Sequence, residues 1–145
     1  MGRADFLYSG FLSKLQYEAT SCQDALLRKV ADFVSSDEND ILVVNGYAGT
    51  GKTSIMAALV QALRQLQQSI VLLAPTGRAA KVLSHYAHTS AYTIHKYIYR
   101  QKQLGEEVFS LNDNLRPNTL FVVDEASMIA NEGATNFGSG ALLDD

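Results

Sequence analysis

The sequence is poor in cysteine and in long apolar runs, which excludes a disulfide-stabilised fold and a membrane-spanning helix. Its single cysteine, Cys22, rules out an internal disulfide bond and is compatible with a reducing cytosol. No apolar run approaches the ~20 residues needed to span a bilayer, and residues 1–11 lack the pattern of a signal peptide. Phe6 occupies the position where a myristoylation signal has Ser or Thr. We therefore expect a cytoplasmic protein with no membrane attachment.

Acidic residues are absent from Ile41 to Gly105, although the chain has 15 of them and a formal net charge of −3. Buried strands explain part of this absence, but residues 78–102 are polar and hold five cations and all three histidines. The same stretch holds four tyrosines: Tyr86, Tyr92, Tyr97 and Tyr99. Cations interleaved with aromatic rings suit single-stranded nucleic acid, because phosphates meet the charges and bases stack on the rings. Packing of the tyrosines on helix faces is an equally good explanation for the rings.

Three short apolar runs predict strands that are buried on both faces of a parallel sheet: Ile41–Val44, Ile70–Ala74 and Thr119–Asp124. Helical patterns alternate with them, so the 145 residues predict one α/β domain with right-handed crossovers. Further elements are predicted along the chain. They are a short packed helix within residues 1–19, a helix that runs to about Val34 from Thr20 or Ser21 as N-cap and packs Cys22, a turn at Thr89–Thr93, a helix at Ile94–Gln101 capped by Thr93, and a small strand at Val108–Leu111.

A phosphate-binding loop follows the first predicted strand. Its residues fit G-x-x-x-x-G-K-[ST] and lead through Ser54 into an apolar helical stripe: Gly46, Tyr47, Ala48, Gly49, Thr50, Gly51, Lys52 and Thr53. Glycines let successive N–H groups point at an anion, and the helix N-terminus adds positive potential. Lys52 can reach the β- and γ-phosphates of ATP, and the Thr53 hydroxyl can ligate Mg²⁺. The alternative is a glycine-rich turn that matches by chance.

An acidic pair, Asp124-Glu125, closes the third predicted strand. In a parallel sheet ligands collect at the carboxyl edge, so we expect Asn45, Ala74 and Asp124 to end their strands there together. Asp124 would then complete the Mg²⁺ site with Thr53, and Glu125 would orient and deprotonate the attacking water. The alternative is an ordinary acidic turn after a core strand.

Four successive motifs resemble those of superfamily 1 DNA helicases: GYAGTGKT, APTGRAAKVL (Ala74–Leu83), TIHK (Thr93–Lys96) and VVDEASM (Val122–Met128). The most similar group is the RecD-like one, which includes the exodeoxyribonuclease V alpha subunit and the phage Dda helicase. The resemblance covers about Thr20 to Asp145 and implies a P-loop NTPase (RecA-like) three-layer fold. It also implies a motor that translocates 5′ to 3′ on single-stranded DNA, with roles in DNA repair and recombination.

The resemblance implies roles for further residues. DNA contacts would come from Thr76, Gly77, Arg78, Thr93, His95 and Lys96, and Gln23 lies where the family's adenine-reading glutamine precedes the loop. Other roles stay open, because Arg78 could be a solvated cation, His95 a capping or core residue, and Gln23 an ordinary helix residue. Residues 97–118 stand where the family inserts a small subdomain.

The chain departs from the family beyond Asp124, where the next strand and the second lobe of the motor do not follow. We therefore expect a single partial RecA-like domain over residues 1–145, with a helical lead-in (1–40), the loop and DNA motifs (41–96), an insertion (97–118) and a tail (119–145). An incomplete sheet leaves backbone groups unpaired, so we expect self-association or a distorted sheet.

The sequence thus predicts the nucleotide-binding part of an ATP-dependent DNA helicase, with ATP and Mg²⁺ as cofactors and little turnover from this chain alone. The alternatives are a non-motor P-loop ATP-binding protein or kinase, and a motor subunit that works beside helicase–nuclease partners.

Overall fold

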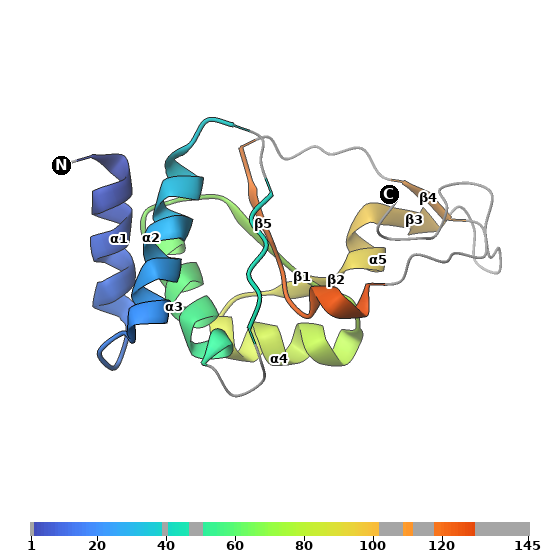
Figure 1. The fold of residues 1–145 in the computed structure, drawn as a ribbon. Helices are drawn as coiled ribbons and strands as arrows, with labels where there is room; N and C mark the ends of the chain where they lie inside the picture. The colour runs from blue at the N-terminus through green and yellow to red at the C-terminus, as the bar shows by residue number, and fades with distance from the viewer. Residues whose placement is uncertain (1, 39–40, 47–50, 102–108, 112–117, 130–145) are drawn as a thin grey trace. The chain divides into compact units, whose positions relative to one another are not determined.

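The computed structural model describes residues 2–38, 41–46, 51–101, 109–111 and 118–129, whose elements are labelled in Figure 1. The chain divides into two compact units, one of Met1–Ile70 with Tyr86–His88 and one of Val71–His85 with Thr89–Asp145. In the described part of the chain, no helix combines the length and apolar character needed to cross a bilayer.

The first unit is built from three helices: α1 (Arg3–Lys14), α2 (Ser21–Ser35) and α3 (Lys52–Gln65). Helix α1 packs against both of the others, with Leu7 and Phe11 fully inside the contact. The predicted helix within residues 1–19 is therefore confirmed. Each large apolar side chain buried in this way contributes about 1.5–3 kcal/mol to the stability of the unit.

Helix α2 has Thr20 as its N-cap, the first of the two predicted candidates, and Ser21 is its first helical residue. The Thr20 hydroxyl accepts a hydrogen bond from the Gln23 backbone N–H (3.3 Å), and Gln23 Oε1 accepts one from the Thr20 N–H (3.0 Å), which forms a capping box. The buried face of the helix holds Leu27, Val30 and Ala31. The prediction that Cys22 packs inside is wrong, because Cys22 lies about 140° around the helix from Leu27 and is exposed.

The second unit contains a three-stranded sheet in the order β2-β1-β5. Its strands are β1 (Ile70–Ala74), β2 (Ala91–Thr93) and β5 (Leu120–Val123), and β1 pairs with β2 in parallel with Leu72 opposite Ala91. The Asp124 N–H donates to the Leu73 carbonyl (3.0 Å), so β5 ends beside the end of β1 and runs parallel to it. Helix α4 (Gly77–Ala87) connects β1 to β2, which confirms the predicted α/β class with a parallel sheet.

Strand β1 is buried on both faces, as predicted. Alternate residues of a strand point to opposite sides, and Val71 and Leu73 pack with Ile94 of helix α5 (Ile94–Ile98). On the other side, Ala74 packs with three further alanines: Ala79, Ala80 and Ala91. The small alanine side chains allow α4 to approach the sheet closely.

Two predicted elements differ in extent or type. The turn predicted at Thr89–Thr93 contains β2, because parallel pairing with β1 makes a strand of three residues that show no strand pattern of their own. Helix α5 ends at Ile98 and not at Gln101, since β3 (Tyr99–Gln101) pairs antiparallel with β4 (Phe109–Leu111). Strand β4 confirms the small strand that was predicted at Val108–Leu111, apart from Val108, which lies outside the described residues.

The strand predicted at Ile41–Val44 is wrong in this structure. Residues 41–46 have no regular secondary structure, and the side chains of Ile41 and Val43 are 90% and 72% exposed. Within the described part of its unit no strand pairs with this segment, and an extended segment without a partner does not bury its side chains. Strand β5 also differs from the prediction, because its exposure alternates and Phe121 and Val123 lie on an open face.

Candidate functional site

The phosphate loop is described at both of its ends, whereas the predicted site residues Tyr47, Ala48, Gly49 and Thr50 lie outside the described residues. The Lys52 ammonium donates a hydrogen bond to the Gly46 carbonyl oxygen. The first and last parts of the motif are therefore held together by the lysine side chain, which turns back along the loop. This orientation brings the positive charge of Lys52 to Gly46, the first residue of the motif.

Gly51 is the N-cap of α3 and has a left-handed backbone with φ of 79°. A residue with a Cβ is strained in this conformation, which explains the glycine at this position of the motif. Behind it, Lys52, Thr53 and Ser54 form an exposed first turn that contains no acidic residue. The helix predicted after the loop is confirmed, and its first-turn N–H groups, which have no partner within the helix, lie at its positive dipole end.

Gln23 lies beside this helix start. A Cβ atom built on Gly51 would stand 3.0 Å from Gln23 Nε2 and 3.9 Å from the hydroxyl oxygen of Tyr17. The Gln23 Oε1 atom is used in the capping box of α2, so the Nε2 amide hydrogens are the part of the side chain that faces the loop. The predicted adenine-reading residue is therefore close to the phosphate loop, while its reading of a base stays a prediction.

The acidic pair stands at the carboxyl edge of the sheet in the second unit. Asp124 follows β5 next to the end of β1, and its Oδ1 atom accepts a hydrogen bond from the Glu125 N–H (2.9 Å). Glu125 is exposed and has φ of 53°, a left-handed backbone that costs a non-glycine residue about 1–2 kcal/mol. Ala74 and Asp124 thus end neighbouring strands at one edge, as predicted, whereas Asn45 does not end a strand.

The predicted magnesium site combines Thr53 of the first unit with Asp124 of the second, so it stays a prediction. A hydroxyl and a carboxylate are oxygen donors of the kind that Mg²⁺ prefers, and the phosphates of a bound nucleotide would complete its shell. Among the residues that the structure describes, no three His, Cys, Asp or Glu side chains are grouped as a metal site of their own.

The predicted DNA-contact residues lie together in the second unit, and two of them cap helices. The Thr76 hydroxyl accepts from the Ala79 N–H (3.1 Å) at the start of α4, and the Thr93 hydroxyl accepts from the Lys96 N–H (3.2 Å) at the start of α5. The other members of the set are exposed: Gly77, Arg78, His95 and Lys96. Exposure excludes the core role that was left open for His95, whose ring lies 5.4 Å from that of Tyr99.

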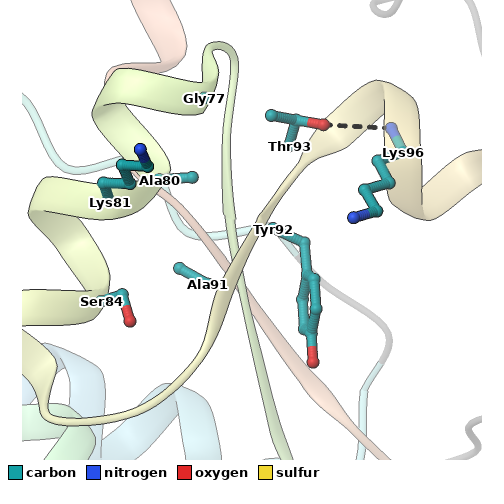
Figure 2. A pocket seen from close by; sticks show the side chains of 8 residues that line it. All are labelled: Gly77, Ala80, Lys81, Ser84, Ala91, Tyr92, Thr93 and Lys96. Carbon is teal, nitrogen blue, oxygen red and sulfur yellow. Dashed lines mark hydrogen bonds between the residues drawn. The ribbon is translucent and has the colours of Figure 1, made fainter.

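A cavity of about 310 Å³ opens between α4 and the β2–α5 segment. Figure 2 shows its lining side chains, three of which were predicted to touch DNA: Gly77, Thr93 and Lys96. The sequence reasoning did not single out the lining residues Lys81 and Ser84, which lie one and two turns along α4 from Gly77. Helical spacing from the predicted motif was the signal that could have found them.

Comparison with known family models assigns the chain to a family. A family model described as AAA domain matches residues 20–141, which include the phosphate loop, the DNA motifs and the acidic pair. The chain belongs to the AAA domain family. Its α/β fold, with a parallel sheet and a glycine-initiated helix after the loop, is that of a P-loop NTPase.

Three curated proteins, two of them named as DNA helicases, are similar to this AAA domain. The ATP-dependent RecD2 DNA helicase of Deinococcus radiodurans is 32% identical over 61% of the chain and 12% of its own length. The RecBCD enzyme subunit RecD of Buchnera aphidicola is 30% identical over 63% of the chain and 18% of its own length. The ATP-dependent DNA helicase dda of phage T4 is 33% identical over 60% of the chain and 21% of its own length.

The AAA domain spans between 9% and 27% of the length of five curated relatives that it matches. The similarities support the resemblance to superfamily 1 helicases and, for this chain, a nucleotide-binding function of the helicase type.

Proposed function

We propose that the chain is the nucleotide-binding part of the first motor lobe of an ATP-dependent DNA helicase of the RecD-like group. The observation that carries this proposal is the geometry at the start of α3, where Lys52 closes on Gly46 and Gly51 takes a left-handed turn. Such a loop, followed at once by a helix N-terminus, forms an anion site for the phosphates of a nucleotide. The names of the similar proteins support DNA unwinding as the work that this nucleotide drives.

In this proposal the residues of the loop divide the work of binding ATP. Lys52 neutralises the β- and γ-phosphates, and the exposed N–H groups of the first turn of α3 hold phosphate oxygens. Gln23 contacts the adenine base from the side of the loop on which its amide hydrogens lie. Thr53 and Asp124 would hold a Mg²⁺ ion, which would supply charge neutralisation at the transferred phosphoryl group, and Glu125 would orient the attacking water.

The second unit would contact the DNA strand. Its exposed residues Arg78, His95 and Lys96 supply charge and hydrogen-bond donors, and no acidic residue lies between Ile41 and Gly105 to repel the phosphates. A non-motor ATP-binding protein or kinase has no use for this surface. An affinity for oligo-dT that falls with added salt therefore separates the helicase from that alternative.

The proposal is tested by the Lys52→Ala variant. We expect the affinity for a fluorescent ATP analogue to fall at least about tenfold, since a charge-assisted hydrogen bond contributes about 1.5–3 kcal/mol. The matched control is Lys29→Ala on the exposed face of α2, which removes the same charge from the same unit. Circular dichroism checks that both variants are folded. Unchanged nucleotide affinity in Lys52→Ala would remove the phosphate-loop assignment and the motor function with it.

The activity of a complete motor is tested in a longer protein that contains this chain. Lys52→Ala should there abolish DNA-stimulated ATP hydrolysis without unfolding the protein. The proposal extends to helicase–nuclease partners because one similar protein is named a subunit of the RecBCD enzyme. Co-purification of the longer protein with a nuclease subunit tests that extension.

A further inference from the structure

We propose that Tyr17 and Gln23 form a base site beside the phosphate loop that takes adenine and guanine nucleotides alike. The amide hydrogens of Gln23 donate to N7, which both purines have, and the Tyr17 hydroxyl bonds the group on C6, which differs between them. This Tyr17–Gln23 pair rests on the proposed function, because it concerns the base of the triphosphate that the loop would hold. It widens the expected substrate from ATP to purine nucleoside triphosphates.

Two side chains converge on the start of α3. A Cβ atom on Gly51 would lie 3.0 Å from Gln23 Nε2 and 3.9 Å from the hydroxyl oxygen of Tyr17. Within the described part of the chain, and apart from the neighbours of Gly51 itself, no other side-chain atom lies within 4 Å of that point. The amide and the hydroxyl are therefore the two polar groups that border the last glycine of the motif.

The packing of α1 fixes the place of Tyr17. Tyr17 lies in the connection of residues 15–20 between α1 and α2 (Figure 1), and α1 packs against both α2 and α3. The connection is thereby anchored to the two helices whose first turns carry Gln23 and follow Gly51. The side chain of Tyr17 is 45% exposed, so a ligand can reach it.

The capping box of α2 decides which end of the Gln23 amide a base would meet. Gln23 Oε1 accepts from the Thr20 N–H (3.0 Å), and a flipped amide would lose this bond because a backbone N–H can only donate. Oε1 lies more than 4 Å from the Cβ point of Gly51, whereas Nε2 lies 3.0 Å from it. The loop side of Gln23 therefore offers only donors. Donors suit N7 of either purine, but they cannot accept from the amino group that distinguishes adenine from guanine.

The Tyr17 hydroxyl suits either group on C6. By rotating its hydrogen it can accept from the amino group of adenine or donate to O6 of guanine. Among the residues that the structure describes, none forms a hydrogen bond with this hydroxyl or with Gln23 Nε2. Both groups of the Tyr17–Gln23 pair are therefore available to a base.

Selection of guanine alone would need a carboxylate, which accepts from N1–H and from the amino group on C2. Glu18 and Asp24 are the carboxylates next to the Tyr17–Gln23 pair in the sequence. Asp24 already accepts hydrogen bonds from two other side chains, and no atom of Glu18 lies within 4 Å of the Cβ point of Gly51. The described base site thus contains no group that rejects either purine.

The first test measures how well unlabelled nucleotides displace a ribose-labelled fluorescent ATP analogue from the full chain. We expect the affinities for ATP and GTP to agree within about threefold, less than the roughly fivefold effect of one average hydrogen bond. We expect 7-deaza-GTP, which lacks the N7 acceptor, to bind about 2- to 12-fold more weakly than GTP. A larger preference for either purine would overturn the proposal. Equal affinities for GTP and 7-deaza-GTP would also overturn it, because Gln23 would then not contact N7.

The second test isolates Tyr17 with purine riboside triphosphate, which carries only hydrogen on C6. Wild type should bind ATP about 2- to 12-fold more tightly than this analogue, and Tyr17→Phe should bind the two equally. Both comparisons are made within one protein, so a change in stability does not affect the ratio. The control Tyr92→Phe removes a hydroxyl of similar exposure, 43%, from β2 and should keep the wild-type ratio. A wild-type ratio in Tyr17→Phe would remove Tyr17 from the base site.

A third set of variants separates this proposal from the proposed function. Glu18→Gln should leave the ratio of GTP to ATP affinity unchanged, and a loss of GTP affinity alone would show that a carboxylate reads guanine. If both nucleotides bind through Lys52 but the base preferences differ from those expected, the Tyr17–Gln23 pair fails alone. If the base preferences are as expected and Lys52→Ala changes nothing, the phosphate-loop assignment fails alone. A wild-type chain that binds neither triphosphate overturns both.

Discussion

The Nε2 atom of Gln23 lies 3.0 Å from the point where a Cβ atom on Gly51 would stand. Gly51 also has φ of 79°, so Gly51→Ala would meet both a backbone strain of about 1–2 kcal/mol and a displaced glutamine. We expect this variant to lose at least about 1 kcal/mol of unfolding free energy, measured by urea denaturation. Its affinity for ATP should fall as well, because the turn that leads into α3 must change.

The matched control for this variant is Gly10→Ala in α1. A Cβ atom on Gly10 would be 3.8 Å from Leu66 Cδ1, which is an ordinary contact, and the residue lies inside a helix. Alanine should therefore raise the unfolding free energy by about 0.5–1 kcal/mol. Equal effects of the two substitutions would contradict the argument from the left-handed turn.

Gln23 has a structural and a proposed functional role, and Gln23→Glu separates them. Glutamate at this position completes the capping box with Thr20 as well as glutamine does, so the stability of α2 should be kept. Glutamate lacks the amide hydrogens that face the loop. If these donate to N7 of adenine, the variant loses one hydrogen bond to the base, which corresponds to an affinity about 2- to 12-fold lower.

The base analogue 7-deaza-ATP provides the control for this measurement, because it carries a C–H group in place of the acceptor N7. Wild type should prefer ATP over 7-deaza-ATP, and Gln23→Glu should bind the two equally. This ratio is insensitive to repulsion between the new carboxylate and the phosphates, which both ligands share. The same preference in wild type and variant would leave Gln23 as a capping residue only.

Elements specified by neighbouring residues were predictable from the sequence. The N-caps Thr20 and Thr93 form the expected hydrogen bonds, and α3 and β1 lie where the apolar periods indicate. A cap, a helical stripe or a doubly buried run depends on residues a few positions apart.

Elements that depend on distant pairing were not predictable. The apolar run Ile41–Val44 predicts a buried strand, but these residues form no strand in the structure. A β-strand forms only where another strand pairs with it. The converse case is β2, where Ala91–Thr93 became a strand because the edge of β1 was available. Neither outcome is visible in the residues themselves.

The candidate site shows the same division. The motif glycines and Lys52 were singled out from local spacing, and the described ends of the motif show a hydrogen bond from Lys52 to Gly46 and a left-handed Gly51. The cavity between α4 and the β2–α5 segment was missed in part, because Lys81 of α4 and Ala91 of β2 line one space only when α4 folds back onto the sheet beside β2. Thr76 and Thr93 were named as DNA contacts, and the structure adds that their hydroxyls already cap helices.

The double role of Thr76 leads to a paired prediction. Aspartate and asparagine both cap helices at least as well as threonine, so Thr76→Asp and Thr76→Asn should keep the melting temperature of the wild type. If the Thr76 loop grips the strand backbone, the added carboxylate repels phosphates and Thr76→Asp binds oligo-dT more weakly than Thr76→Asn. Anisotropy at low salt measures the difference, which should shrink as salt is added. Equal affinities of the two variants would remove Thr76 from the DNA surface.

The exposed apolar segment at residues 41–44 predicts self-association of the chain. Val43 is 72% exposed within a run of β-branched residues, and such a segment is a template for pairing with a second chain. We expect Val43→Lys to lower the apparent mass in sedimentation experiments while changing the unfolding free energy by less than about 0.5 kcal/mol. Val82→Lys on α4 is the control, since it adds the same charge at another exposed valine. A wild-type chain that sediments as a monomer at all concentrations contradicts this prediction.

A cluster of three side chains links α1 to α2 and makes stability depend on pH. The Tyr8 hydroxyl donates a hydrogen bond to Asp24 Oδ1, and the Arg28 Nε–H donates to Asp24 Oδ2 (3.0 Å). The Arg28 guanidinium carbon also lies 4.2 Å from the centre of the Tyr8 ring. The hydrogen bond from Tyr8, followed by that from Arg28, lowers the pKa of Asp24, and the same bond to Asp24 raises the pKa of Tyr8.

The two shifts act at opposite ends of the pH scale. Because the pKa of Asp24 is lowered by folding, its contribution is present above the unfolded pKa and is lost as pH falls through the folded one. The pKa of Tyr8 is raised, so its contribution is complete below the unfolded value of about 10 and is lost as pH rises through the folded value. Tyr8→Phe keeps the ring over Arg28 and removes only the hydroxyl.

We expect Tyr8→Phe to lower the melting temperature at neutral pH and to move the pKa of Asp24 upward in an NMR titration of its carboxyl carbon. The difference in melting temperature between the variant and the wild type should become smaller below the pKa of Asp24 and above that of Tyr8. At these pH values the wild type also lacks the hydrogen bond from the Tyr8 hydroxyl to the Asp24 carboxylate. Asp32→Asn, at an exposed position of α2, is the control that removes a carboxylate outside the cluster. A Tyr8→Phe variant with the wild-type pKa at Asp24 would show that Arg28 alone holds the carboxylate, and the link between α1 and α2 would then rest on apolar packing.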